Sequence, residues 1–227
     1  MKTKAVMAWS GGKDSAVALW RLQQDAKFEV AGLLTTLTAG YDRISMQGVR
    51  RVLLEAQAET LGLRVYHVWV PPHCSNQVYE AEMSRAVETL QGDGVEAVAF
   101  GDLFLEDVRA YREKMLAPTG LQPLFPIWGE DTNDLSRWVI GNGFQATLSC
   151  VDPRALSPDF VGRAYDEALL AELPPEVDPC GENGEFHTFV HDAPNFRQPI
   201  LITVGERVQR DGFFFADLLP MAGVGRV

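Results

Sequence analysis

Cysteine is scarce in this chain and forms no paired motif. The three cysteines, Cys74, Cys150 and Cys180, lie far apart in 227 residues. There is no CxxC pair, and no cluster of cysteine and histidine has the spacing of a zinc site. This pattern excludes a CxxC sulfur relay and fits a reducing compartment, so we expect a cytoplasmic protein.

Long hydrophobic runs are also lacking. No apolar stretch approaches the roughly 18 residues that a transmembrane helix needs. The run AVMAW near the amino terminus is too short for the core of a secretion signal. We therefore expect no membrane span and no membrane partner.

Positively charged residues are few. The chain has 20 lysines and arginines against 31 aspartates and glutamates, which gives a formal net charge of -11. The field of such a protein repels nucleic acids and anionic membranes. Nucleic acid is therefore not an expected partner. A polyanionic substrate must instead be held by a local positive site.

The composition is otherwise ordinary for a globular protein, with 46% hydrophobic and 22% charged residues. We find no internal repeat and no low-complexity segment. At roughly 150 residues per domain, the length predicts between one and two domains.

The first half of the chain alternates short apolar runs with helical patterns, which predicts a parallel sheet. The fold class is therefore α/β, a doubly wound, Rossmann-like parallel sheet, and we consider the strand order 3-2-1-4. The expected strands are 4–9, 28–36, 64–70 and 96–101, and the expected helices are 15–24, 49–61 and 78–90.

The pattern changes after Asp102. A charged helical stretch, 106–116, leads into the proline-rich connector APTGLQPLFPIWGEDT. This connector predicts two domains, 1–125 and 126–227, of which the second is smaller and of α+β type. In the second domain we expect helices at 133–141 and 160–173, strands at 145–151, 186–192, 199–209 and 211–219, and a hairpin turn at Asp211-Gly212.

The segment SGGKDS, residues 10–15, connects the first expected strand to the first expected helix. Two glycines permit a tight turn with accessible amides, the helix start and Lys13 add positive charge, and Ser10 and Ser15 add hydroxyl donors. The segment therefore predicts a phosphate-binding loop. It has neither the Walker A nor the GxGxxG spacing, which argues against γ-phosphate transfer and dinucleotide redox chemistry. A simple turn with a serine cap is the alternative, but a turn alone has no need for the lysine.

This loop resembles the pyrophosphate loop, or PP-loop, of the ATP pyrophosphatases of the HUP superfamily, which cleave ATP between its α and β phosphates. The resemblance implies that Lys13 neutralises the pyrophosphate and that Asp14 lies near a magnesium ion. It also implies that the pyrophosphate is held by Ser10, Gly11, Gly12 and Ser15.

Four further blocks, which cover nearly the whole chain in order, narrow the resemblance to the diphthine–ammonia ligase family of diphthamide biosynthesis. The implied reaction is an amidation in which the carboxylate of diphthine, a modified histidine of elongation factor 2, is adenylated and ammonia displaces AMP. The implied cofactors and partners are ATP, Mg²⁺, ammonia and this carboxylate, and a homodimer is left open. The blocks are GDLFLEDVRAYREK, PLFPIWGEDTNDL, GFQATLSCVDPRAL and DPCGENGEFHTFVHD.

Ligands of doubly wound sheets bind outside the carboxyl ends of the strands, where the strand order reverses. In the order 3-2-1-4, this rule places Gly101 and Asp102 beside the glycines of the loop. Asp102 is therefore a candidate metal or ribose ligand, and its alternative role is the N-cap of a helix that starts near Phe104. The geometry of the resembling family places Thr35, at the end of the second strand, beside the adenine through backbone groups.

The block GENGEFHT contains Glu182, Glu185 and His187 just before an expected strand. The resemblance places this block in the active cleft, where the two glutamates hold magnesium or position the amine and the histidine handles protons. From composition alone, a solvated turn is the alternative.

The segment YDRISMQGVR, residues 41–50, resembles a family block that faces the substrate. The family often has histidine where this chain has Gln47. Arg50 is a candidate substrate contact, and its alternative role is a surface residue of an amphipathic helix.

Two other functions stay open. A PP-loop enzyme of the same chemistry could act on a different small molecule or on tRNA, although the missing CxxC pair and basic stripe argue against tRNA. A non-catalytic adenine-nucleotide-binding module is the second. Lys13, Asp14 and the acidic GENGE block count against it, because a pure binder need not position a metal over the α phosphate.

Overall fold

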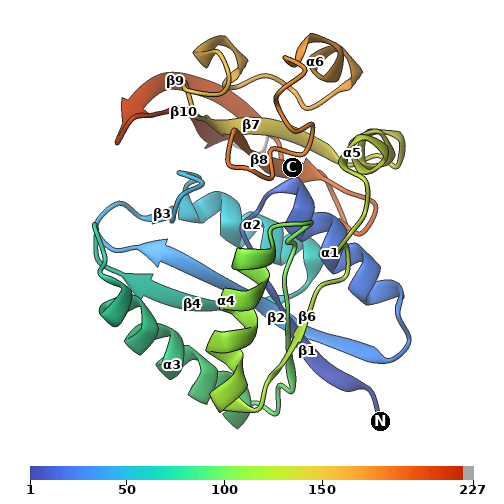
Figure 1. Cartoon of the computed structure of the whole chain (residues 1–227), viewed down its shortest axis with the longest axis vertical. Coiled ribbons are helices and arrows are strands. Elements are labelled where there is room, and N and C mark those ends of the chain that lie inside the picture. Colours follow the sequence, from blue (N-terminus) through green and yellow to red (C-terminus); the bar gives the residue numbers. More distant parts are fainter. Residues whose placement is uncertain (222–227) are drawn as a thin grey trace, which may run out of the picture.

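A computed structural model describes residues 1–221, in which the chain forms two sheets (Figure 1). The last residues of the predicted second domain, 222–227, lie outside this description. In the described part of the chain, no helix combines the length and the apolar character needed to cross a membrane.

The first sheet is mostly parallel and has the order β4-β2-β1-β5-β6, with β3 attached to the end of β2. The predicted order 3-2-1-4 is confirmed as β4-β2-β1-β5, and β6 adds an edge strand that the sequence did not predict. Only β3 is antiparallel. The strands are β1 Thr3–Ala8, β2 Phe28–Thr38, β3 Arg43–Ile44, β4 Arg64–Val70, β5 Ala97–Ala99 and β6 Gln122–Leu124.

Helices cover both faces of this sheet, which confirms the α/β fold class. One buried cluster joins the sheet to α1 (Lys13–Gln24) and α2 (Arg51–Leu61). A second cluster on the other face joins it to α3 (Asn76–Gly92) and α4 (Glu106–Leu116). A one-turn 3-10 helix, η1 (Ala117–Thr119), follows α4 directly.

The start of α4 removes one of the two roles predicted for Asp102. The N-cap position belongs to Leu105, and no side chain caps the helix there. The prediction that Asp102 caps this helix is therefore wrong, because the helix starts later in the chain than expected.

The second sheet is antiparallel and has the order β8-β7-β10-β9. Between β9 and β10, Asp211 and Gly212 have φ angles of 49° and 87°. Two successive left-handed residues are the requirement of the tight hairpin turn that Asp-Gly predicted. The strands are β7 Gln145–Val151, β8 Phe186–Asp192, β9 Ile202–Arg210 and β10 Phe213–Pro220, and α5 (Thr132–Gly141) precedes them.

The helix expected at 160–173 is wrong over its first half. Only Glu167–Glu172 forms a helix, α6, and a 3-10 turn, η2 (Pro158–Phe160), lies before it. Between them, the N–H of Gly162 donates to Leu148 O and the N–H of Tyr165 donates to Ala146 O. This segment therefore pairs with β7, and a pairing partner distant in the sequence outweighs the local helical pattern.

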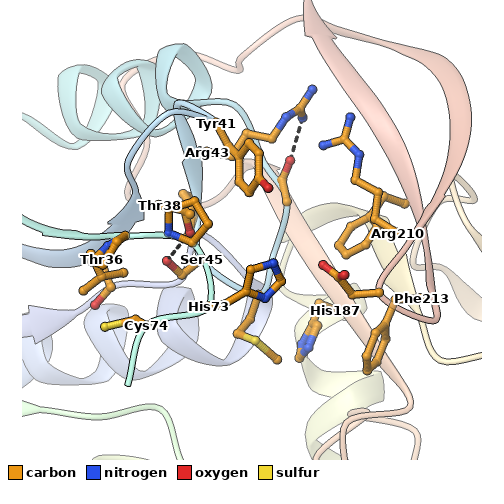
Figure 2. Close-up of a pocket in the computed structure, with 18 of the residues that line it drawn as sticks. Thr36, Thr38, Tyr41, Arg43, Ser45, His73, Cys74, His187, Arg210 and Phe213 are labelled. Atoms are coloured by element: carbon orange, nitrogen blue, oxygen red, sulfur yellow. Dashed lines mark hydrogen bonds between the residues drawn. The ribbon is translucent and has the colours of Figure 1, made fainter. Parts of the chain in front are cut away.

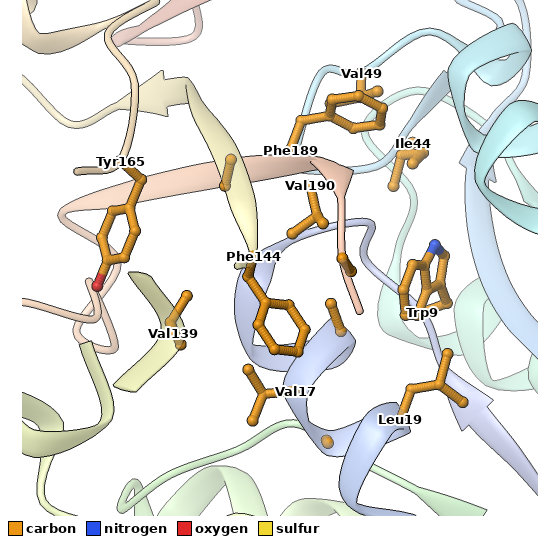
Figure 3. Close-up of a cluster of buried hydrophobic side chains, with 14 of the residues drawn as sticks. Trp9, Val17, Leu19, Ile44, Val49, Val139, Phe144, Tyr165, Phe189 and Val190 are labelled. Atoms are coloured by element: carbon orange, nitrogen blue, oxygen red, sulfur yellow. The ribbon is translucent and has the colours of Figure 1, made fainter. Parts of the chain in front are cut away.

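The two sheets share one hydrophobic core (Figure 3). Val17 and Leu19 of α1 belong to the same buried cluster as Phe144, Phe189 and Val190. The antiparallel sheet therefore packs against the face of the parallel sheet that α1 and α2 cover. The division of the chain at residue 125 stays a prediction.

Candidate active site

The segment Ser10 to Ser15 connects β1 to α1, beside the point where the strand order reverses between β1 and β5. Gly12 is the N-cap of the helix, and Gly11 has a φ of 81°. A Cβ atom at position 11 would lie 2.9 Å from the Gln57 Oε1 atom. Only glycine fits there, because the conformation is left-handed and the neighbouring side chain is close.

Side-chain hydroxyl groups accept hydrogen bonds from some of the backbone N–H groups of this loop. The N–H of Gly12 donates to Ser10 Oγ at 3.2 Å, and the N–H of Lys13 donates to Thr188 Oγ1 at 3.0 Å. The Ser10 and Ser15 hydroxyls lie 3.1 Å apart. Within residues 1–221, the first-turn amides of Asp14 and Ser15 are left for another acceptor. A helix N-terminus with unpaired amides favours an anion.

Gln57 and β8 hold the loop from behind. Gln57 is fully buried; its Nε2 atom donates to Gly11 O at 3.0 Å and to Val190 O at 2.7 Å, and its Oε1 atom accepts from Trp9 Nε1 at 2.9 Å. The N–H of Val190 also donates to Gly11 O, at 2.9 Å. Sequence reasoning missed Gln57 and Thr188, and the one signal was a glutamine on the otherwise apolar face of α2.

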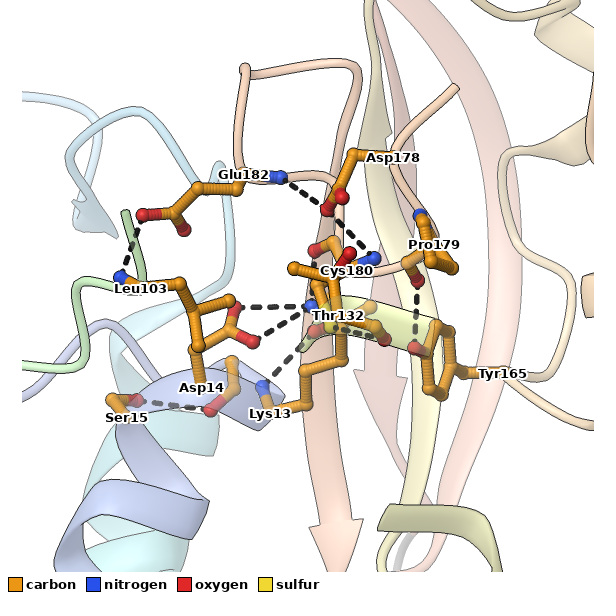
Figure 4. Close-up of polar contacts among 12 residues, drawn as sticks. Lys13, Asp14, Ser15, Leu103, Thr132, Tyr165, Asp178, Pro179, Cys180 and Glu182 are labelled. Atoms are coloured by element: carbon orange, nitrogen blue, oxygen red, sulfur yellow. Dashed lines mark hydrogen bonds and ion pairs between the residues drawn. The ribbon is translucent and has the colours of Figure 1, made fainter. Parts of the chain in front are cut away.

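The ammonium of Lys13 is engaged by groups of the protein itself (Figure 4). It lies 2.9 Å and 3.0 Å from the two carboxylate oxygens of Asp14, donates to Cys180 O, and faces the rings of Tyr165 and Phe186. Burial opposes the charge, but Asp14 and its neighbours outweigh that effect and raise the pKa of Lys13. The side chain is therefore charged and already paired.

A cavity of about 270 Å³ opens in front of the loop. The structure brings most of the predicted site residues to its walls. A Cβ atom at Gly101 would lie 2.9 Å from the backbone of Asp14, so the end of β5 packs directly on the first turn of α1. The predicted residues that line the cavity are Ser10, Gly12, Lys13, Asp14, Ser15, Gly101, Asp102, Glu182 and His187.

Carboxyl groups converge on this cavity. Burial, aided by the negative charges of Asp14 and Asp102, raises the pKa of Glu182 to about 7, although its Oε1 atom accepts the N–H of Leu103 at 2.8 Å. Burial also raises the pKa of Asp102, whose Oδ2 atom is buried without a hydrogen-bond partner. The cavity thus concentrates negative charge that a bound cation would relieve.

This donor set fits a magnesium ion carried by a nucleotide. Mg²⁺ prefers oxygen ligands and is held by one or two carboxylates together with phosphates and water. Asp14 and Asp102 would supply the carboxylates, and the Oδ2 atom of Asp102 has no hydrogen-bond partner. No group of three histidine, cysteine, aspartate or glutamate residues within 1–221 forms a metal site by itself, and a nucleotide-borne ion does not need one.

His187 lies between this cavity and a larger one of about 760 Å³, and its side chain lines both. Burial, together with the charge of Lys13, lowers the pKa of His187 to about 4. The imidazole is therefore neutral at pH 7.

The larger cavity lies at the carboxyl ends of β2 and β4 and beneath the β9–β10 hairpin (Figure 2). Thr36 and Val70 come from the parallel sheet, and Phe213 and Phe215 come from the antiparallel sheet. Its walls are mostly apolar, which suits a planar base or an organic acyl group.

Four predicted site residues line neither cavity. Gly11 forms the left-handed turn of the loop, and its carbonyl faces Gln57. The Thr35 side chain is buried and donates to Trp9 O at 3.0 Å, whereas its neighbour Thr36 lines the larger cavity. Glu185 is buried within its own loop, where its Oε1 atom accepts the N–H of Asp178 at 3.0 Å. Arg50 pairs with Asp217, with an Nη2–Oδ2 distance of 2.6 Å.

Among the lining residues of the smaller cavity that lie outside the predicted set, Gln47 and Arg112 have long polar side chains. Gln47, from the loop after β3, was noted only as a departure from the family, and its Oε1 atom is buried without a partner. Arg112 comes from α4. Its signal was present in the sequence, since it lies in the block GDLFLEDVRAYREK, but a helical arginine is most often a surface residue.

Comparison with known proteins agrees with this arrangement. The chain is 28% identical over 229 residues to a human protein named diphthine–ammonia ligase, across 91% of this chain and 85% of the human one. A zebrafish (Danio rerio) protein of the same name is 28% identical across 91% of this chain and 89% of its own. A Schizosaccharomyces pombe protein of that name is 27% identical across 88% of this chain but only 36% of its own length.

Two family models match the chain in succession. The diphthamide synthase N-terminal domain matches residues 1–123, and the diphthamide synthase C-terminal domain matches residues 131–217. Since the first match alone spans more than half of the chain, this protein belongs to the diphthamide synthase family.

Proposed function

We propose that this protein is an ATP-dependent, AMP-forming ligase that joins ammonia to a carboxylate, and that the carboxylate is that of diphthine on elongation factor 2. The observation that carries the proposal is the shared cavity in which the PP-loop, which includes Asp14, faces Asp102 and Glu182. Membership of the family, whose named relatives are diphthine–ammonia ligases, supports the substrate.

In this proposal, the phosphates of ATP occupy the smaller cavity. The amides of Asp14 and Ser15 and the hydroxyls of Ser10 and Ser15 bind phosphate oxygens at the start of α1. The adenosine lies in the larger cavity, against the backbone at the end of β2, where Thr35 contributes its main chain and Thr36 its side chain. Residues 1–125 supply the nucleotide site, and residues 126–227 supply the opposite wall.

Magnesium, held by Asp14 and Asp102, would supply positive charge to the phosphates as the bond between the α and β phosphates breaks. Adenylation is needed because a carboxylate has no good leaving group. Its oxygen attacks the α phosphorus, pyrophosphate leaves, and the acyl adenylate then offers AMP as the leaving group when ammonia attacks the acyl carbon.

The pKa values distinguish two candidates for the general base that accepts the proton lost by the attacking ammonia. A general base works best when its pKa lies near the operating pH. Without a bound cation, Glu182 has a pKa of about 7 and meets this condition, whereas His187, with a pKa of about 4, is too weak a base. We assign the proton to Glu182 and leave His187 as a neutral hydrogen-bonding group between the two cavities. Glu185 shapes the loop that carries Glu182.

The proposal is tested by incubating the protein with Mg²⁺, ATP labelled at the α phosphate, ammonium chloride and elongation factor 2 that carries diphthine. We expect AMP, pyrophosphate and the amide in equal amounts. The Glu182→Gln variant should retain the exchange of labelled pyrophosphate into ATP that depends on the carboxylate, and should lose amide formation.

Each other outcome has a definite meaning. ADP as the product contradicts the chemistry. AMP formed only with small carboxylic acids contradicts the diphthine assignment and retains the ligase mechanism. Tight ATP binding with no product from any carboxylate supports a nucleotide-binding module instead.

A further inference from the structure

Arg112 is the second cation of the smaller cavity. Among the lysine and arginine residues described, only Lys13 and Arg112 line this cavity. Arg112 extends from α4, and its guanidinium lies 5.0 Å from the centre of the Phe100 ring. An anion that enters the cavity therefore meets one of these two side chains.

Lys13 has no donor left for such an anion. An ammonium has three N–H donors, and the two carboxylate oxygens of Asp14 and the carbonyl of Cys180 engage them. The side chain is 2% exposed. Binding a phosphate through this ammonium would first break a buried ion pair, which is costly because it leaves Asp14 without its partner.

Arg112 is less fully engaged than Lys13. Its Nε atom forms an ion pair with Asp102 Oδ2 at 3.6 Å, a distance too long for a hydrogen bond. Both atoms are buried, and neither has a hydrogen-bond partner. Buried polar atoms without partners are rare in native proteins and require an explanation. A phosphate beside the guanidinium and a cation beside the carboxylate would give both groups a partner.

We propose that Arg112 is the side chain that binds the outer phosphates of ATP and the pyrophosphate product, and that Lys13 is a positioning residue that fastens the loop of Cys180 to α1. This inference rests on the proposed function, which supplies the polyphosphate ligand. The chemistry suits it, because a guanidinium presents planar paired donors that match phosphate oxygens. Phe100 and Asp102 orient the guanidinium at the cavity wall.

The test is calorimetric titration of the protein with ATP, inorganic pyrophosphate and AMP in the presence of Mg²⁺. We compare the natural protein with Arg112→Gln, Arg112→Lys and the control Arg109→Gln. Arg109 lies on the same helix, but it pairs with Glu113 and stacks on Phe125 and Trp128 outside this cavity. Thermal unfolding of each variant confirms that it is folded.

We expect Arg112→Gln to weaken ATP and pyrophosphate binding by about 10- to 100-fold, the range for a lost charge-assisted contact. AMP binding should change less than about twofold, because AMP lacks the outer phosphates. Arg112→Lys should retain part of the affinity, since it keeps the charge and loses the paired donors. Arg109→Gln should bind all three ligands as the natural protein does.

Two results would overturn this inference and leave the proposed function intact. Unchanged pyrophosphate affinity in Arg112→Gln shows that the guanidinium does not bind the phosphates. An equal loss of AMP and ATP affinity shows that Arg112 only shapes the cavity. A natural protein that binds neither ATP nor pyrophosphate overturns the proposed function, and the inference falls with it.

Discussion

Gln57 is the residue through which the antiparallel sheet should control the PP-loop. Its side chain is fully buried and bonds Trp9, Gly11 and Val190, which belong to three different segments. Replacing it with leucine keeps a similar volume and removes every polar contact. The Gln57→Leu variant therefore isolates the hydrogen bonds from the packing.

The expected loss of stability follows from the partners left behind. The Trp9 N–H and the Val190 carbonyl lose the partner that Gln57 supplies, whereas the Gly11 carbonyl keeps the bond from the Val190 N–H. Each orphaned buried group costs about 1–3 kcal/mol. The greater apolar burial of leucine offsets about 1 kcal/mol of this loss. We expect a net decrease of about 1–5 kcal/mol in the free energy of unfolding.

Urea unfolding measured by far-ultraviolet circular dichroism gives this free energy by linear extrapolation. The matched control is Gln77→Leu, the same substitution at an exposed position of α3. The network argument also predicts weaker pyrophosphate binding in Gln57→Leu, because Gly11 loses a support. If the two variants differ by less than about 0.5 kcal/mol, the network does not hold the loop and the reasoning is refuted.

Two further predictions concern buried charge. Lys13→Met should lower the free energy of unfolding by about 2–4 kcal/mol, because it leaves the partly buried Asp14 carboxylate without its cation; a loss below about 1 kcal/mol in urea unfolding contradicts the fastening role. His187 should make the protein less stable in mild acid, because its folded pKa of about 4 lies below the unfolded value of 6.5. The unfolded state then gains the proton first, so stability falls as the pH drops from 6.5 towards 4, by about 2 kcal/mol between pH 7 and pH 5. His187→Gln should lose this part of the pH dependence, and equal slopes for the two proteins would disprove it.

Elements with a strong local pattern were predictable from the sequence. The strands at 145–151 and 186–192 and the helix at 106–116 have the predicted bounds. Their alternating or helical periodicity is a property of neighbouring residues. The segment 160–166 was not predictable in this way, because its pairing with β7 depends on residues about 15 positions earlier in the chain.

The candidate site shows the same division. Thr35 and Thr36 are adjacent threonines in one strand, so their side chains point to opposite faces of the sheet. Which of them reaches the cavity depends on the packing of that sheet, and the structure selects Thr36. The sequence GENGE does not distinguish Glu182 from Glu185. In the structure, Glu185 accepts hydrogen bonds from its own loop, whereas Glu182 lines the cavity.

By itself, the sequence determined that the first sheet is parallel and that the PP-loop lies between its first strand and first helix, since apolar periodicity and two glycines suffice for both. The net charge of -11 also required the positive charge for a polyanion to be local. The tertiary structure alone decided how the two nearby cations are used. The antiparallel sheet and the Cys180 loop close over Lys13, so the ammonium of the motif is paired and buried, while α4 brings Arg112 to the cavity with a donor unpaired. A side chain's availability depends on what packs against it, and the Cys180 carbonyl that engages Lys13 comes from a loop distant in the sequence.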